Sequence, residues 1–221
     1  MSAPRQLALA LPHAESFARE DFLMGAPNQA ALAMVERWPD WPDRALALIG
    51  PEGAGKSHLA AIWAELAGAR RVSARALGET NLMAALATGA LVIEDASVPL
   101  DERALFHLLN LIREEEAFLL ITAQAAPALW GTALPDLASR LRAVPTVALS
   151  APDDALLRAV LVKLFADRQL DVDGNLLSYL ATRIERSFAA ARAAVEALDR
   201  EALRLKRPVT RALAAELLRE A

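Results

Sequence analysis

One stretch of this sequence combines residue types and a spacing that could hold phosphate groups. Residues 50–57 read Gly-Pro-Glu-Gly-Ala-Gly-Lys-Ser and match the pattern GxxxxGK[S/T], with an apolar run before them and a helical periodicity after them. In such a loop the glycines let backbone N–H groups turn toward phosphate oxygens, the lysine reaches the β and γ phosphates, and the serine can ligate Mg²⁺. The alternative is a chance match on a glycine-containing turn. We expect a site for a nucleoside diphosphate or triphosphate, formed by Gly50, Gly53, Ala54, Gly55, Lys56, Ser57 and His58.

Two adjacent carboxylates, Glu94 and Asp95, follow an apolar strand predicted at residues 90–93. A phosphate-loop protein needs acidic groups at such a strand end to hold Mg²⁺, usually through a water, and to polarise the attacking water. The alternative is that the two acids only mark where a strand leaves the core. Because they follow Lys56 within an alternation of strands and helices, we expect them to serve the metal and the reaction.

Other polar side chains are placed where they could complete such a site. Thr122 follows an apolar strand predicted at residues 118–121, and the carboxyl end of a parallel strand lies beside the ligand crevice in doubly wound sheets. Arg183, Arg186 and Arg192 lie in the C-terminal part of the chain. An arginine from such a region can reach a bound nucleotide, although for each of them a plain surface position is the alternative.

The elements that must position these residues alternate along the first two thirds of the chain. We predict strands at residues 45–49, near 72, and at 90–93, 118–121 and 146–149, with helices at 58–66, 81–88, 100–115 and 134–142. This alternation predicts an α/β fold with a parallel sheet. Before the first strand, Asn28 is expected to cap a helix. Trp38 and Trp41 are expected to pack in the core and not to contact a ligand.

The last third of the chain shows only helical patterns. Amphipathic segments run over residues 152–168, 173–185, 187–205 and 209–221. This change predicts a small all-helical domain at residues 151–221 beside a nucleotide-binding α/β domain at residues 13–150. Residues 1–12 precede both and contain an alternation of leucines, which fits either a separate peptide or a short edge strand.

Composition excludes several classes of protein. The 221 residues are 55% hydrophobic and 24% charged, which is enough for a sizeable core, and no apolar run approaches the ~20 residues of a membrane span. There is no cysteine, and the three histidines have no zinc-binding spacing. A net charge of −4 argues against a protein that coats nucleic acid. Without a signal peptide in this sequence, we expect a cytoplasmic protein.

The order of these signals resembles the AAA+ ATPases, and within them the DnaA-related family. The resemblance is carried by Phe17-x4-Phe22-x2-Gly25-x2-Asn28 before the phosphate loop and by Leu105-Phe-His-Leu-Leu-Asn110 after the acidic strand. It implies an AAA+ parallel sheet with helices on both faces, plus a small C-terminal all-helical lid domain. DnaA initiators continue into a helix-turn-helix domain and carry an extra helix for single-stranded DNA. This sequence stops with the lid, and residues 57–94 are too short a span for that helix. What remains is similar to the Hda family, the DnaA homologues that inactivate DnaA.

The resemblance implies roles for individual residues. Arg140, within Leu137-Ala-Ser-Arg-Leu141, matches the arginine finger that acts on the nucleotide of a neighbouring subunit, and Arg192 matches the lid arginine. Thr122 takes the polar sensor position, and Glu94 and Asp95 take the acidic positions, with Ser57 and Glu94 on Mg²⁺. The sliding-clamp peptide of the family corresponds to Gln6, Leu7, Leu9 and Leu11.

The resemblance also implies a function. We expect a regulator of replication initiation that binds ADP or ATP with Mg²⁺, docks on the DNA-loaded sliding clamp and stimulates hydrolysis of DnaA-bound ATP, which would associate it with the nucleoid or replisome. Its own hydrolysis is expected to be weak, because Glu94 stands where the family more often has Asp and Ala123 follows Thr122 where initiators have a small polar residue. Direct DNA contact is expected to be weak or indirect. The sequence does not decide whether the protein forms a homodimer. The alternatives are a helicase loader or initiator-type ATPase, which has no need of a clamp peptide, and a metabolic kinase, which needs an acceptor pocket.

Overall fold

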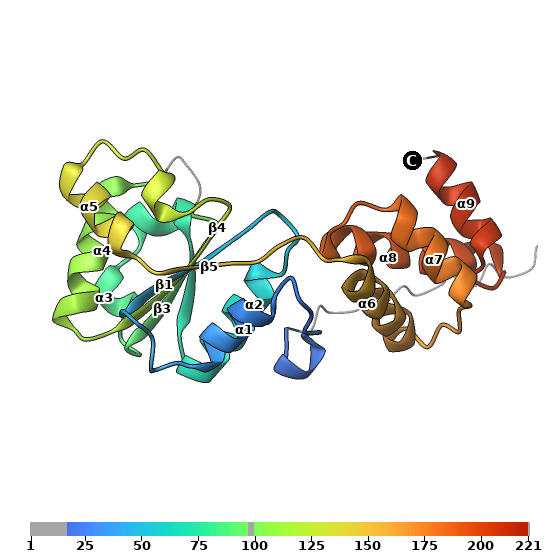
Figure 1. Ribbon diagram of the computed structural model, residues 1–221, viewed down its shortest axis with the longest axis horizontal. Helices are drawn as coiled ribbons and strands as arrows, with labels where there is room; N and C mark the ends of the chain where they lie inside the picture. Colours follow the sequence, from blue (N-terminus) through green and yellow to red (C-terminus); the bar gives the residue numbers. More distant parts are fainter. Residues whose placement is uncertain (1–16, 97–99, 221) are drawn as a thin grey trace, which may run out of the picture. The chain divides into compact units, whose positions relative to one another are not determined.

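The computed structural model describes residues 17–96 and 100–220, without the side chain of Glu220. The predicted clamp peptide, Gln6–Leu11, lies outside the described residues. The chain divides into two compact units, one ending at Ala151 and one beginning at Pro152. Figure 1 draws both, and each is described here by itself.

The first unit is built on a five-stranded parallel sheet with the order β2-β3-β4-β1-β5. Its central strands β1, β3 and β4 are almost fully buried runs of apolar residues, as expected for parallel strands covered on both faces. The register pairs Leu48 with Thr122 and Ile49 with Ala123, so the carboxyl ends of β1 and β4 meet at one edge. The strands are β1 (Ala45–Ile49), β2 (Arg70–Ser73), β3 (Ala90–Glu94), β4 (Phe118–Ala123) and β5 (Thr146–Ala148).

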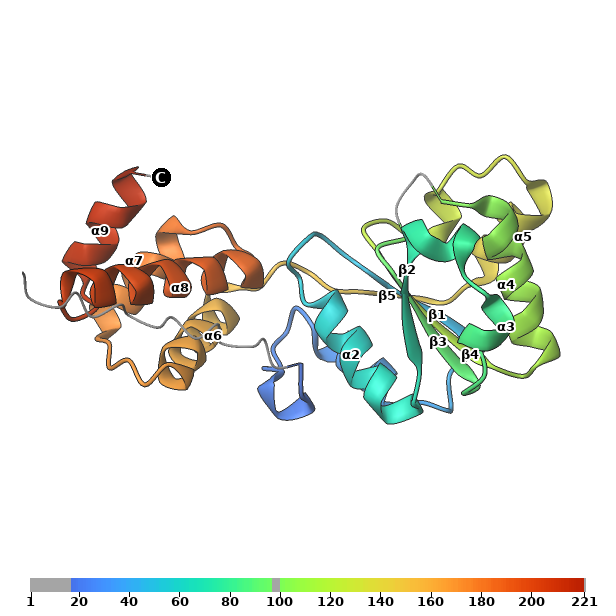
Figure 2. The same ribbon diagram turned by 180° about the vertical axis from the view of Figure 1, so that it is seen from behind.

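Helices cover both faces of this sheet, as Figures 1 and 2 show. Side chains alternate along each strand, so that Leu46 and Leu48 of β1 pack with the helices α1 (Gln29–Glu36) and α2 (Lys56–Ala67). Ala45 and Ala47 face the opposite cluster. That cluster is formed with η2 (Ala74–Glu79), α3 (Leu82–Ala85), α4 (Glu102–Glu114) and α5 (Pro135–Ala143). Two single turns, η1 (Arg19–Asp21) and η3 (Pro127–Leu129), complete the unit.

Two local predictions were wrong. The helix expected at residues 81–88 is reduced to the four residues of α3, because the backbone bonds then change to three-residue spacing, with Ala87 N–H on the Ala84 carbonyl and Gly89 N–H on the Leu86 carbonyl, and the chain leaves at Gly89 with a φ of 75°. Asn28 precedes α1 but makes no side-chain cap. Its Oδ1 accepts the Gly25 N–H at 2.8 Å and its Nδ2 donates to the Leu23 carbonyl at 3.0 Å. Asn28 is buried, so its amide is satisfied within the turn before the helix.

The tryptophans pack as predicted. Trp41 stacks on Trp63 of α2 with ring centroids 5.0 Å apart, and Trp38 meets Trp63 edge to face at 6.4 Å. The Trp41 indole N–H donates to the Met34 carbonyl at 2.8 Å, which satisfies its polar atom. These rings pack with residues of α1, α2 and β1 in one core cluster, which holds α2 against the sheet.

The second unit contains α6 (Asp154–Asp167), α7 (Gly174–Arg183), α8 (Phe188–Leu205) and α9 (Arg211–Glu220). Each of the four helices begins at a side-chain cap: Asp153, Asp173, Ser187 and Thr210 each accept a backbone N–H three residues on, at 2.8, 2.8, 3.0 and 3.3 Å. Leu161, Phe165 and other apolar residues of all four helices form its core. None of the helices within the described ranges is both long and apolar enough to span a membrane.

Candidate nucleotide-binding site

The loop between β1 and α2 has the backbone shape that the glycine pattern predicts. Gly50, Gly53 and Gly55 adopt φ values of 152°, 71° and 94°, where side chains are strongly disfavoured. Gly55 precedes α2 without any side-chain cap. The first N–H groups of α2 therefore receive no side-chain acceptor from the cap position, and together with the helix dipole they form a place suited to an anion.

Lys56 opens α2 and is buried inside this loop, with only 8% of its surface exposed. Its Nζ donates to the carbonyls of Gly50 at 2.8 Å and Pro51 at 2.7 Å. Burial lowers the pKa of Lys56, and attraction by Asp95 and then Glu52 opposes that lowering. The loop thus holds an ammonium group among oxygens, the environment that phosphate oxygens would supply, so these residues fit a phosphate ligand.

Gly50 is required where the loop leaves β1. Its N–H donates to the Ala123 carbonyl at 3.2 Å, and a Cβ at this position would lie 2.2 Å from the Leu149 carbonyl oxygen. The clash is with backbone, so it cannot be relieved by a rotamer change. The motif predicted a glycine at position 50, but its contact with Leu149, the residue after β5, could not be read from any pattern.

We predict that Gly50→Ala lowers the free energy of unfolding by about 1–3 kcal/mol, through overpacking and a strained φ. Urea denaturation of the purified protein measures this. Gly68→Ala is the matched control, because Gly68 also has a positive φ of 63° but has no atom within 4 Å of the added Cβ. The Gly50 variant should lose more stability than the Gly68 variant, and an equal loss would contradict the steric argument.

The acidic strand end places its two carboxylates differently. Glu94 is half-buried and its Oε1 lies 2.8 Å from Nη2 of Arg71 on β2. Asp95 has a φ of 54°, and its backbone N–H donates to Thr122 Oγ1 at 3.0 Å. Thr122 itself is fully buried. The structure therefore brings Asp95 and Thr122 together, with Asp95 near enough to attract the Lys56 ammonium, and it pairs Glu94 with Arg71, which was not among the predicted site residues.

Ser57 and His58 follow Lys56 in the first turn of α2. Ser57 is half-buried, in the position from which its hydroxyl would meet a metal ion on bound phosphates. His58 is engaged with the start of the unit: its Nε2 is 3.0 Å from the Ala18 carbonyl oxygen, and its ring meets Phe17 and Phe22 edge to face. His58 thus ties the segment before α1 to the phosphate-loop helix.

The two arginines predicted to act on nucleotide lie in separate parts of the molecule. Arg140 is on α5, which packs on the opposite face of the sheet from α2, and its guanidinium lies over the Phe106 ring at 4.9 Å. The N-terminus of α5 is held by Glu102, whose carboxylate accepts the N–H groups of Ala133 and Leu134 at 2.9 and 3.2 Å. Arg192 is half-buried on α8 in the helical unit.

Within residues 17–96 and 100–220, no three histidine or acidic side chains converge to form a protein-only metal cage. A Mg²⁺ ion that accompanies nucleotide needs no such cage, because phosphate oxygens and waters supply most of its ligands. Ser57 and one carboxylate at the end of β3 would complete them. These donors fit Mg²⁺ bound together with nucleotide.

Several solved structures have the same architecture as this chain. Domain III of the Thermotoga maritima replication initiation protein DnaA matches with a TM-score of 0.75 over 95% of this chain and 98% of that one, at 18% identity. The chain has the AAA+ fold. The prediction of an AAA+ phosphate-loop sheet with a C-terminal helical part is therefore confirmed, although no known family model and no curated protein sequence matches the chain.

Two further structures show the same fold. The initiator DnaA bound to AMPPCP and single-stranded DNA matches with a TM-score of 0.67 at 17% identity, over 86% of this chain and 68% of that one. The Thermotoga maritima Holliday junction branch migration motor RuvB matches with a TM-score of 0.63 at 18% identity, over 78% of this chain and 60% of that one. The fold is thus shared with a replication initiator and with a branch migration motor.

Proposed function

We propose that residues 50–58 bind ADP or ATP together with Mg²⁺. The observation that carries this is the loop itself: glycines at positive φ, an uncapped helix start and the buried ammonium of Lys56 converge on one point. A DnaA structure of the same fold holds AMPPCP, an adenine nucleotide analogue. That likeness supports adenine nucleotide as the ligand class for this chain.

We propose further that the protein regulates replication initiation by inactivating DnaA, as the Hda family does. In this proposal it docks on the DNA-loaded sliding clamp through Gln6–Leu11 and presents Arg140 to the ATP of a neighbouring DnaA molecule. The likeness over nearly all of DnaA domain III supports a DnaA-like contact between subunits. The placement of Arg140 on the face opposite α2 supports an action on another subunit's nucleotide.

The proposed clamp docking predicts that clamp affinity can be lost without loss of the fold or of ADP binding. Deleting residues 1–11 should leave the fold and ADP binding intact and should abolish both clamp affinity and stimulation of DnaA. A peptide that orders only on binding contributes contacts to the groove of its partner and none to its own core. The assay combines purified protein, clamp loaded on DNA and DnaA–ATP, and follows ATP turnover. Unfolding of the deletion variant would show that the segment belongs to the core and would remove the clamp proposal.

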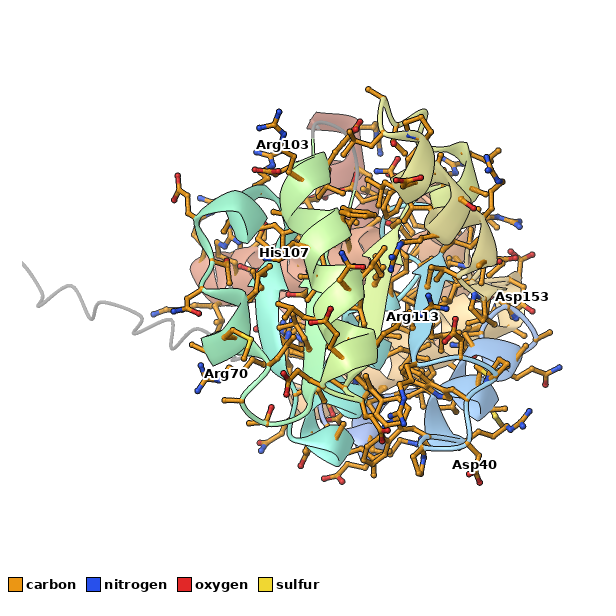
Figure 3. The ribbon with its side chains drawn as sticks, turned by 90° about the vertical axis from the view of Figure 1, so that its left-hand side faces the viewer. Asp40, Arg70, Arg103, His107, Arg113 and Asp153 are labelled. Carbon is orange, nitrogen blue, oxygen red and sulfur yellow. The ribbon has the colours of Figure 1, made fainter. Side chains whose placement is uncertain are left out.

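A second candidate is an initiator-type or helicase-loader ATPase that contacts DNA. It is favoured by the likeness to DnaA bound to single-stranded DNA and by basic side chains on the outer side of α4, where Arg103, His107 and Arg113 are exposed (Figure 3). Affinity for single-stranded DNA that falls steeply with salt, in the absence of any clamp affinity, would select this candidate.

A further inference from the structure

Glu94 ends β3, and its ion pair directs its carboxylate toward the edge of the sheet. The register pairs Ser73 with Glu94 and Arg71 with Val92, so Arg71 and Glu94 are diagonal neighbours on one face, within reach of long side chains. The contact of 2.8 Å joins the exposed Arg71 to the half-buried Glu94, whose side chains are 38% and 22% exposed. Because β2 is an edge strand, Arg71 holds Glu94 on the side of β3 that lies away from β1.

The order of strands shows that the Glu94 carboxylate is directed away from the phosphate loop. The phosphate loop follows β1, and β4 lies between β1 and β3. At about 4.8 Å between neighbouring strands, the ends of β1 and β3 are about 10 Å apart. A carboxylate at the end of β3 must therefore extend over β4 to approach bound phosphates, and Glu94 is paired in the opposite direction.

Asp95 is placed on the side of β3 that Glu94 leaves. Its backbone N–H donates to Thr122 Oγ1 of β4 at 3.0 Å, and the next N–H, of Ala96, donates to the Thr122 carbonyl at 2.8 Å. Thr122 is in turn paired with Leu48 of β1. The left-handed φ of Asp95, which aspartate tolerates better than most residues, lets the chain turn over β4 at this point.

The charges agree with this placement. Asp95 is the first of two carboxylates, with Glu52, whose attraction opposes the lowering of the Lys56 pKa by burial. Asp95 is also exposed. An exposed carboxylate near the phosphate-loop lysine can meet a hydrated Mg²⁺ ion, which prefers to keep several of its waters.

We propose that Asp95, and not Glu94, is the carboxylate that serves Mg²⁺ in the nucleotide complex, and that Glu94 is a structural partner of Arg71. This proposal rests on the nucleotide binding proposed above. It reassigns the metal role within the acidic pair. It also accounts for a protein that holds nucleotide, because Glu94, the carboxylate that ends β3, is paired with an arginine and directed away from the reacting phosphates.

The test is calorimetric titration of the full chain with ADP, with and without Mg²⁺. The wild type should bind ADP more tightly when Mg²⁺ is present. Asp95→Asn should lose this enhancement, with Mg²⁺ affinity reduced about ten- to a hundred-fold, the usual range for residues around a metal. The exchange is isosteric, and the bond to Thr122 uses the main-chain N–H, so the fold should be kept. Glu94→Gln should keep the enhancement.

Arg70→Ala is a control for a change of charge at this sheet edge, because Arg70 is exposed on β2 (Figure 3) and is paired with neither carboxylate in the proposal. Its Mg²⁺ enhancement should equal that of the wild type. Loss of the enhancement in Glu94→Gln, its survival in Asp95→Asn, or its absence from the wild type would each overturn the assignment. Titration with ADP in the absence of Mg²⁺ tests the nucleotide site separately from the metal assignment. If the wild type does not bind ADP at all, the proposed function fails, and not only the assignment of Asp95.

Discussion

Replacing Arg140 with alanine is expected to abolish the proposed stimulation of DnaA-bound ATP hydrolysis while leaving the protein folded. An arginine supplied to a neighbouring nucleotide stabilises the charge that develops on the transferring phosphoryl group, and such a finger is worth about 10³–10⁵ in rate. Within its own chain the Arg140 guanidinium lies over the Phe106 ring, and both residues are half-buried. A cation–π contact contributes about 0.5–1 kcal/mol at exposed sites and about 2 kcal/mol when desolvated, so the variant should stay folded.

The measurement is ATP turnover in a reconstituted mixture of DnaA–ATP, clamp loaded on DNA and wild-type or variant protein. Nucleotide affinity and clamp binding of the variant should be unchanged. Arg142→Ala is the control, because Arg142 is an exposed arginine on the same helix. If Arg140 only complements the dipole of its own helix, a surface effect of about 0.3–1 kcal/mol, both variants will stimulate as the wild type does, and the inactivator mechanism fails.

Replacing Lys56 with alanine is expected to abolish nucleotide binding. The change removes the one ammonium group that the loop holds, which donates to two loop carbonyls and is positioned for the terminal phosphates. Ligand stabilises a folded protein by RT ln(1 + [L]/Kd), which is about 2.7 kcal/mol at a concentration one hundred times Kd. The whole of this increment should vanish in the variant.

Thermal unfolding with increasing ADP or ATP measures the loss. Lys163→Ala serves as control, since Lys163 forms a surface ion pair with Asp167 in the helical unit and such pairs contribute little to stability. Its nucleotide-dependent shift should match that of the wild type. A shift of normal size in Lys56→Ala would show that the loop does not bind phosphate.

The local signals in the sequence were sufficient for the elements that carry the site. Strands β1, β3 and β4 are short apolar runs that parallel strands buried on both faces must have, and the GxxxxGK[S/T] pattern specified the loop because few other residues tolerate its φ values. Side-chain caps are also local, which explains why the helices of the second unit were found, with starts one or two residues later than predicted.

The contacts of each polar residue were decided only by the tertiary structure. Asn28 has the residue type of a helix cap, yet burial makes it satisfy its amide within the preceding turn. Glu94 and Asp95 are neighbours in sequence, but the register of β2 gives Glu94 an arginine and the turn over β4 gives Asp95 a threonine. Strand order and register arise from packing of residues far apart in the chain, so no pattern within the acidic stretch could distinguish the two carboxylates.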